Sequence, residues 1–145
     1  MEINETVKRL YEEWRTHGKI ILAVDFDDTV SPWRLRSQEQ CDETIAQVKN
    51  AQDVGAYVMI FTACDPDRYA YIHEYMAGKG VKVDTINEPP IKGLRYGNFV
   101  KPYYNHLLDD RAGLGQAVAD LEAAMVMMRS YKHGQTMDYP GASGF

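Results

Sequence analysis

The chain has 145 residues and a formal charge of −5, with 16 Lys and Arg against 21 Asp and Glu. This length suits one domain with a sizeable core, and a hydrophobic fraction of 45% excludes disorder across the whole chain. No apolar run is long enough to span a bilayer, and the acidic balance argues against extended nucleic-acid binding.

The amino-terminal segment predicts an amphipathic helix over residues 5–16. Its apolar residues recur at helical spacing: Val7, Leu10, Tyr11 and Trp14. The segment lacks the apolar core of a secretory signal, so we expect a cytoplasmic protein. Cys41 and Cys64 are expected to be reduced thiols in that compartment.

Strand and helix patterns alternate along the rest of the chain. Short apolar runs predict buried strands at residues 19–24, 56–61, 81–86 and 104–108. Helical patterns follow at residues 38–53, 65–77 and 114–131. Asp65 and Pro66 are typical of a helix start, as a cap followed by proline in the first turn. Residues 87–103, rich in proline and glycine, are predicted to form a loop.

This alternation predicts an α/β fold: a three-layer Rossmann-like domain with a mainly parallel sheet of strand order about 3-2-1-4. Right-handed crossovers would place helices on both faces of the sheet. We expect a single domain over residues 1–132, with its core in residues 19–132 and a flexible tail at 133–145. Ligands of such sheets bind at the carboxyl ends of the strands.

Polar residues directly follow three of the predicted strands. They are Asp25, Asp27 and Asp28 after the first strand, Thr62 after the second, and Asp109 and Asp110 after the fourth. One such Asp is commonly a turn or cap residue, but the conjunction predicts that these side chains converge at one edge. Carboxylates gathered there repel one another, and Mg²⁺ with oxygen ligands offsets that repulsion.

These motifs resemble the signatures of the haloacid dehalogenase superfamily of phosphohydrolases. ILAVDFDDT (21–29) resembles the first signature, IFTA (60–63) the second, and HLLDDRAG (106–113) the fourth. Lys101 in KPYY resembles the third signature, for which Lys92 is the competitor. Lys101 is preferred because it lies only a few residues before the fourth strand. The resemblance covers about residues 19–115.

The resemblance implies a Mg²⁺-dependent phosphatase that hydrolyses a phosphomonoester through an aspartyl-phosphate. Asp25 would be the nucleophile, and Asp27 would protonate the leaving oxygen and then deprotonate the attacking water. Thr62, Ala63 and Lys101 would bind the transferring phosphate. The substrate class stays open between a nucleotide, a sugar phosphate and a phosphorylated macromolecule.

The resemblance also implies the metal ligands. Mg²⁺ would be held by Asp25, Asp109 and the backbone carbonyl of Asp27, with Asp110 either a further ligand through water or an orienting group. Asp28 replaces the small residue often found at its place in the pattern, and we expect it to be structural, capping a turn.

No room remains for the cap domain that the family often carries. Residues 30–61 and 63–100 already hold core elements and a loop, so the site should be open. The substrate itself, or a partner subunit of a homo-oligomer, would then cover it. Trp33, Arg34 and Arg36 are candidates for the entrance; the alternative is a solvated loop with Trp33 packed inward.

Further arginines are weaker candidates for the entrance: Arg68, Arg95 and Arg111.

The alternative function is a phosphate- or metal-binding regulatory module without turnover. A receiver-type signalling domain would carry its phosphorylated Asp after the third strand, whereas the DxDxT motif here follows the first.

Overall fold

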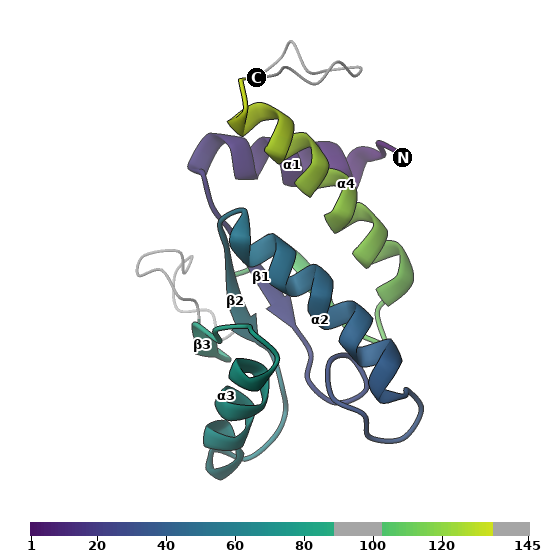
Figure 1. The fold of residues 1–145 in the computed structure, drawn as a ribbon, viewed down its shortest axis with the longest axis vertical. Helices are drawn as coiled ribbons and strands as arrows, with labels where there is room; N and C mark the ends of the chain where they lie inside the picture. Colours follow the sequence, from purple (N-terminus) through teal and green to yellow (C-terminus); the bar gives the residue numbers. More distant parts are fainter. Residues whose placement is uncertain (89–102, 135–145) are drawn as a thin grey trace.

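The computed structural model describes residues 1–88 and 103–134, so Lys92, Arg95 and Lys101 lie outside the described residues. Along the chain the elements are α1 (Glu5–His17), β1 (Ile20–Val24), α2 (Gln38–Asp53), β2 (Ala56–Ile60), the short 3₁₀ helix η1 (Pro66–Arg68), α3 (Tyr69–Gly78), β3 (Thr85–Ile86), β4 (His106–Leu108) and α4 (Leu114–Lys132) (Figure 1). None of these described helices has both the length and the apolar character needed to cross a membrane.

The four strands form one all-parallel sheet in the order β3-β2-β1-β4. This confirms the predicted α/β class and strand order, and no cap domain is present in the described residues. Val24, the last residue of β1, pairs with Ile60 on one side and Leu108 on the other. The residues that follow these three strands therefore leave the sheet at the same edge.

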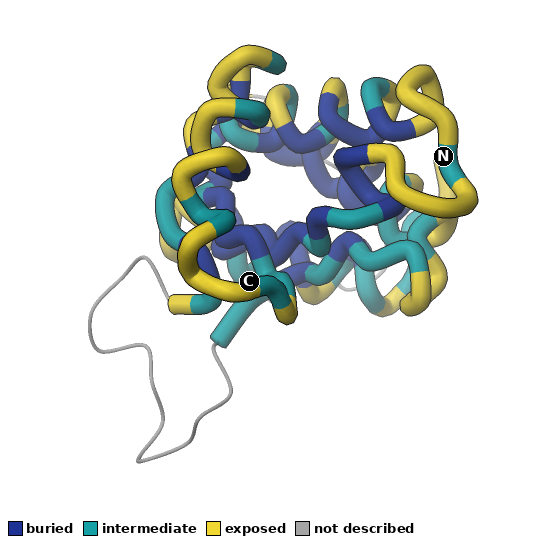
Figure 2. The backbone as a smooth tube through the Cα atoms, turned by 90° about the horizontal axis from the view of Figure 1, so that it is seen from below, coloured by how far each residue is buried: buried dark blue, intermediate teal, exposed yellow. Residues whose placement is uncertain are grey.

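The two faces of the sheet are covered differently. Ile20, Leu22 and Val24 belong to one buried core together with residues of all four described α-helices. Ile21 and Ala23 point to the other face, where a smaller core includes partly buried aromatic side chains: Phe61, Tyr103 and Tyr104. Helices were expected on both faces of the sheet, but within the described residues they cover only the face of Ile20, Leu22 and Val24. Most of the crossover from β3 to β4 falls on residues 89–102, outside them. In Figure 2 the buried segments of the backbone lie toward the interior and the exposed segments lie outside.

The edge strands are shorter than their apolar runs because side chains replace main-chain acceptors at their starts. Asp84 accepts the N–H of Val58 through Oδ2 at 2.8 Å, so β3 begins only at Thr85. Asn105 accepts the N–H of Ile21 through Oδ1 at 2.6 Å, so β4 begins at His106. Apolar residues lie on both sides of Asp84 and of Asn105, which is why the pattern predicted longer strands.

Local signals define the helix ends closely. Ser37 and Gln40 form a capping box at the start of α2, which begins at the predicted residue. Asp65 makes no capping bond with its side chain, and the chain there forms η1 before α3.

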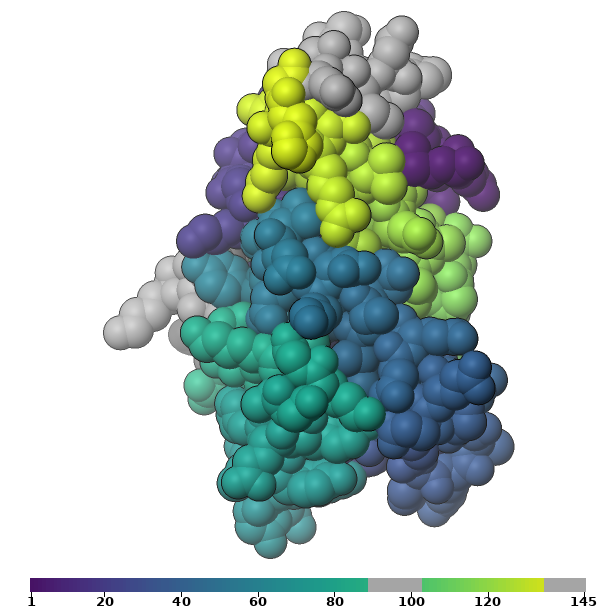
Figure 3. Space-filling model, in the orientation of Figure 1, coloured from purple at the N-terminus to yellow at the C-terminus, as the bar shows by residue number. Residues whose placement is uncertain are grey.

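Figure 3 shows α2 and α3 adjoining on one face of the molecule. An ion pair between Asp42 and Lys79, at 3.0 Å, links them.

Gly55 makes the tight turn from α2 into β2, and we expect it to resist substitution. Its φ is +106°, and a Cβ there would lie 2.8 Å from the carbonyl oxygen of Gly18. Gly55→Ala should lower the free energy of unfolding by about 2 kcal/mol or more, measured by urea denaturation. Gly78→Ala, where a Cβ meets no atom within 4 Å, is the matched control. It should leave stability unchanged or slightly raised, and equal effects of the two changes would contradict the prediction.

Candidate functional site

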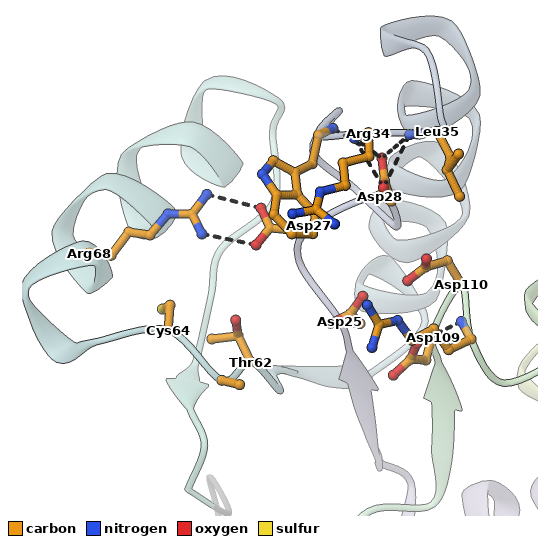
Figure 4. A pocket seen from close by; sticks show the side chains of 13 residues that line it. Asp25, Asp27, Asp28, Arg34, Leu35, Thr62, Cys64, Arg68, Asp109 and Asp110 are labelled. Carbon is orange, nitrogen blue, oxygen red and sulfur yellow. Dashed lines mark hydrogen bonds and ion pairs between the residues drawn. The ribbon is translucent and has the colours of Figure 1, made fainter.

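An open pocket of about 800 Å³ lies at the carboxyl edge of the sheet (Figure 4). The charged residues that line it are Asp25, Asp27, Asp28, Asp109 and Asp110, with Arg34, Arg68 and Arg111. Thr62 and Ala63 line it as well. The structure therefore brings together every predicted site residue that it describes, from three separate stretches of sequence.

Three carboxylates form the tightest cluster in the pocket. Oxygens of Asp25, Asp109 and Asp110 lie within 4.8 Å of one another. Strand pairing causes this, because the N–H of Asp25 donates to the carbonyl oxygen of Leu108 at 2.9 Å and continues the β1–β4 ladder. None of the ion pairs within residues 1–88 and 103–134 involves these three acids. No described cation therefore forms an ion pair with these acids, although Arg111 lines the same pocket.

Thr29 ties the two acidic loops together. Its side chain is fully buried, and Oγ1 lies 3.0 Å from Asp25 Oδ2 and 3.3 Å from Asp110 Oδ1. The same oxygen accepts the N–H of Asp110 at 3.0 Å. The hydroxyl can donate its one hydrogen to either carboxylate, so it holds both at a fixed separation. Sequence reasoning named Thr29 only as part of a motif and missed this role.

The electrostatics of the cluster appear in the pKa of Asp25. Burial raises this pKa from 3.8 to about 7, assisted by hydrogen bonding to Asp110 and by the charges of Asp109 and Asp110, while the Thr29 hydroxyl acts in the opposite direction. Close carboxylates without a cation favour a shared proton over full ionisation. Carboxylate oxygens at this spacing are a donor set that could hold a small divalent cation in place of the proton on Asp25.

Asp27 lies in the pocket but outside this cluster. Its carboxylate accepts hydrogen bonds from both terminal nitrogens of Arg68, each at 3.0 Å. In Figure 4 it points toward Arg68, whereas Asp109 and Asp110 lie on the other side of Asp25. The metal contact expected of Asp27 was through its backbone carbonyl, and its side chain is committed to the arginine. Sequence reasoning named Arg68 only as one of several arginines.

Asp28 organises the loop that borders the pocket. The residue has a φ of 58° and is buried, and its carboxylate accepts N–H bonds from four consecutive residues, Trp33 to Arg36, at 3.0 to 3.2 Å. Burial favours the neutral form, but these backbone donors prevail and hold the pKa of Asp28 below its ordinary value. The expected structural role is thus a backbone nest closed around one side chain.

The entrance residues separate into two groups. Trp33 is 55% exposed and lines the pocket, with the guanidinium of Arg34 4.0 Å from its ring centre. The alternative in which Trp33 packs inward is therefore wrong. Arg36 turns away from the pocket, because its guanidinium donates to the carbonyl oxygens of Asp28 and Thr29 at 3.2 and 3.0 Å. Its expected place at the entrance is wrong too, since it braces the loop instead.

Thr62 is positioned by a residue that sequence reasoning missed. Asn87, with a φ of 59°, accepts the N–H of Thr62 at 2.9 Å and donates to its carbonyl oxygen at 2.8 Å. Asn87 also donates to the hydroxyl of Tyr69 at 3.1 Å. The main chain of Thr62 is thereby fixed, while its hydroxyl makes no hydrogen bond within the described residues. An Asn directly after a strand was the available signal, because Asn tolerates positive φ.

Comparison with known proteins supports the fold and adds nothing on activity. No protein-family model matches the chain, and no match was found among curated proteins. A solved structure of a conserved protein from Bacteroides thetaiotaomicron has a similar fold, with a TM-score of 0.53 and 18% sequence identity. The likeness covers 81% of this chain and 93% of that one. At this identity it shows a shared architecture alone.

The raised pKa of Asp25 predicts how metal-free stability depends on pH. Between pH 4 and 7 the folded state holds a proton that the unfolded state has lost, so stability should fall as pH rises. Thermal unfolding in EDTA should give a melting temperature that falls over this range and a flatter profile for Asp25→Asn. Asp53→Asn, an exposed change on α2, should follow the wild type. MgCl₂ should raise the melting temperature more at pH 8 than at pH 5. A profile that rises with pH in both proteins would refute the assignment.

Thr29 should prove more important for its hydroxyl than for its volume. Thr29→Val keeps the shape of the side chain but leaves the N–H of Asp110 without its acceptor. The free energy of unfolding should fall by about 1–3 kcal/mol. Thr29→Ser, which keeps the hydroxyl, should lose less, and the stabilisation by MgCl₂ should shrink in the Val variant only. Identical unfolding curves for the Val and Ser variants would count against the bridging role.

Proposed function

We propose that the chain is a Mg²⁺-dependent phosphohydrolase of the haloacid dehalogenase type, acting on a phosphomonoester. The observation that carries the proposal is the convergence of Asp25, Asp109 and Asp110 beside Thr62 in one open pocket. Motif resemblance supplies the chemistry, and the parallel sheet with its 3-2-1-4 order agrees with it. Motifs far apart in the sequence need not meet in space, so their convergence in one pocket is an independent observation.

In the first half-reaction, a carboxylate oxygen of Asp25 attacks phosphorus. A bond forms between that oxygen and phosphorus, the bond to the leaving oxygen breaks, and Asp27 donates a proton to the departing alkoxide. The hydroxyl of Thr62, which has no partner among residues 1–88 and 103–134, donates a hydrogen bond to the phosphoryl oxygens, and the ammonium of Lys101 is expected to do the same. The product is an alcohol and an aspartyl-phosphate on Asp25.

In the second half-reaction, water attacks the same phosphorus. Asp27, now ionised, takes the proton from this water, and the bond between phosphorus and the Asp25 oxygen breaks. Inorganic phosphate leaves, and both carboxyl groups return to their starting states. Asp25 and Asp27 suit these paired roles because both line the pocket, while Phe26 between them is fully buried.

Asp25 and Asp109, with the carbonyl of Asp27, are the proposed ligands of Mg²⁺, and Asp110 lies close enough to serve as a further ligand or to orient one. When bound, Mg²⁺ supplies positive charge that offsets the repulsion between the Asp25 carboxylate and the phosphate. Thr29 keeps the two acidic loops at a separation suited to a shared ion. The proposed partner is a small phosphorylated substrate or a phosphorylated macromolecule, or a homo-oligomer that covers the pocket.

One observation favours the alternative of a regulatory module without turnover. Both oxygens of Asp27 are engaged by Arg68, so the proposed acid and base is not free as it stands. A module that only binds phosphate or metal would not need Asp27 to leave Arg68. Turnover by the wild type decides between the two functions.

Hydrolysis of an aryl phosphate tests the proposal directly. Phosphate release by the wild type should require MgCl₂ and stop in EDTA. Asp25→Asn should lower the rate by about a thousandfold or more, because the amide is not a competent nucleophile. Asp27→Asn should slow turnover about a hundredfold and let a phosphoryl adduct accumulate, visible by intact mass spectrometry.

The matched control is Asp53→Asn, which should keep wild-type activity. Undiminished hydrolysis by Asp25→Asn would remove the nucleophile assignment. A wild type inactive toward aryl phosphates and a panel of phosphorylated metabolites and oligonucleotides would favour the regulatory module.

A further inference from the structure

We propose that Arg68 forms an anion subsite in the pocket, which takes a carboxylate or phosphate group on the leaving part of the substrate and thereby releases Asp27. The inference rests on the proposed function, because it assigns Asp27 a task in turnover. It also names a substrate class: phosphomonoesters whose alcohol portion carries a second negative charge. The pairing of Asp27 with Arg68 is the observation that leads to it.

The geometry of the Asp27–Arg68 pair is bidentate. Nη1 of Arg68 lies 3.0 Å from Oδ2 of Asp27, and Nη2 lies 3.0 Å from Oδ1. Such a fork sets the plane and direction of the carboxylate as well as its position. Figure 4 shows that direction: Asp27 faces Arg68 and not Asp25. For Asp27 to reach an oxygen leaving the phosphorus at Asp25, the pair has to open.

The guanidinium of Arg68 is held in place by more than Asp27. Its carbon lies 5.3 Å from the ring centre of Phe26 and 6.0 Å from that of Tyr71. Phe26 is fully buried and contacts Tyr75 edge to face, with ring centres 5.5 Å apart. These rings attract a cation whether or not Asp27 is present. Arg68 therefore keeps its place when Asp27 turns away.

A freed Arg68 lacks another carboxylate partner among the described residues of the pocket. Asp28 is already surrounded by four backbone N–H groups, and the remaining three acids form the proposed metal cluster. The side chain of Arg68 is 37% exposed, so water compensates only part of the lost pairing. An anionic group on the ligand offers the same two-pronged acceptor as Asp27 and makes the exchange favourable.

The position of Arg68 fits the leaving side of the reaction. Asp27 serves the leaving oxygen, and Arg68 lies directly beside Asp27, across the pocket from Asp109 and Asp110. An anion that displaces Asp27 from Arg68 is therefore close to the oxygen that Asp27 has to reach. A substrate without an anionic group leaves Arg68 without a carboxylate or phosphate partner when the Asp27–Arg68 pair opens, so the pocket discriminates against it.

Matched substrates test the subsite. They are 3-carboxyphenyl phosphate, its neutral counterpart 3-carbamoylphenyl phosphate, and benzene-1,3-diyl bisphosphate. Wild-type kcat/KM should be about tenfold or more higher for the carboxylate than for the carboxamide. The bisphosphate shows whether a phosphate is preferred to a carboxylate; a rate above that of the carboxamide for either anion supports the subsite.

Arg68→Gln should act in opposite directions on the two matched substrates. It should lower kcat/KM for the carboxylate about tenfold, and it should raise kcat for the carboxamide because Asp27 is no longer held. Arg68→Lys keeps the charge without the fork and should restore part of the preference. Arg129→Gln, an exposed change at the end of α4, is the control and should alter neither substrate. Equal losses on both substrates would mean that Arg68 only orients Asp27, and unchanged rates would remove the subsite.

Binding separates this inference from the proposed function. The probes are 3-carboxyphenylphosphonate and 3-carbamoylphenylphosphonate, which cannot be hydrolysed, titrated calorimetrically in the presence of MgCl₂. The wild type should bind the carboxylate about tenfold more tightly, and Arg68→Gln should bind both alike. Selective binding without any hydrolysis would sink the proposed function and keep the subsite. Hydrolysis without selectivity in rate or binding would sink the subsite alone.

Discussion

Mutual repulsion among carboxylates at one edge of the sheet is the constraint on which the rest of the pocket depends. Pairing of Val24 with both Ile60 and Leu108 forces Asp25 and Asp109 out of the sheet side by side. Folding thus buries Asp25 beside acids that the unfolded chain keeps apart. Burial above all, and then the hydrogen bond to Asp110 and the charges of Asp109 and Asp110, raise the pKa of Asp25 to about 7. The apo pocket therefore already favours the binding of positive charge.

The chain compensates its pocket acids in different ways. Asp28 accepts hydrogen bonds from backbone N–H groups, and Asp27 pairs with an arginine, so both carboxylates are already engaged. Asp25 and Asp110 share the one Thr29 hydroxyl, and Asp109 accepts the backbone N–H of Arg111, but none of the three forms an ion pair within the described residues. Compensation is therefore incomplete at one place among the described residues. That place is also the one at which carboxylates converge from two strands, as a cation with oxygen ligands requires.

The predictable part of the molecule is the part set by local pattern. Strand and helix alternation predicted the sheet order, and the position of the acids after their strands predicted the shared edge. The Asp27–Arg68 pair was out of reach, because it joins residues 41 apart and depends on η1 turning one arginine toward the pocket. Asp28 was predicted to be structural, but its bonds to four backbone N–H groups were out of reach, since they need a positive φ and a loop that closes around the side chain. Lys101 stays a prediction, because it lies outside the described residues.

The absence of a cap in the described residues changes where selectivity has to arise. A cap domain would contact the substrate from above; here the contacts must come from loops of the core itself. Two such loops carry exposed cationic or aromatic groups: the Asp28-braced loop with Trp33 and Arg34, and the turn after β2 with Arg68. Side chains brace both loops by hydrogen bonds to the main chain, from Asp28 in the first and from Asn87 in the second, so binding loses little conformational entropy in them. An open pocket with such a rim favours ligands that bring their own complementary charge, because no cap domain within the described residues closes over a neutral ligand to exclude water.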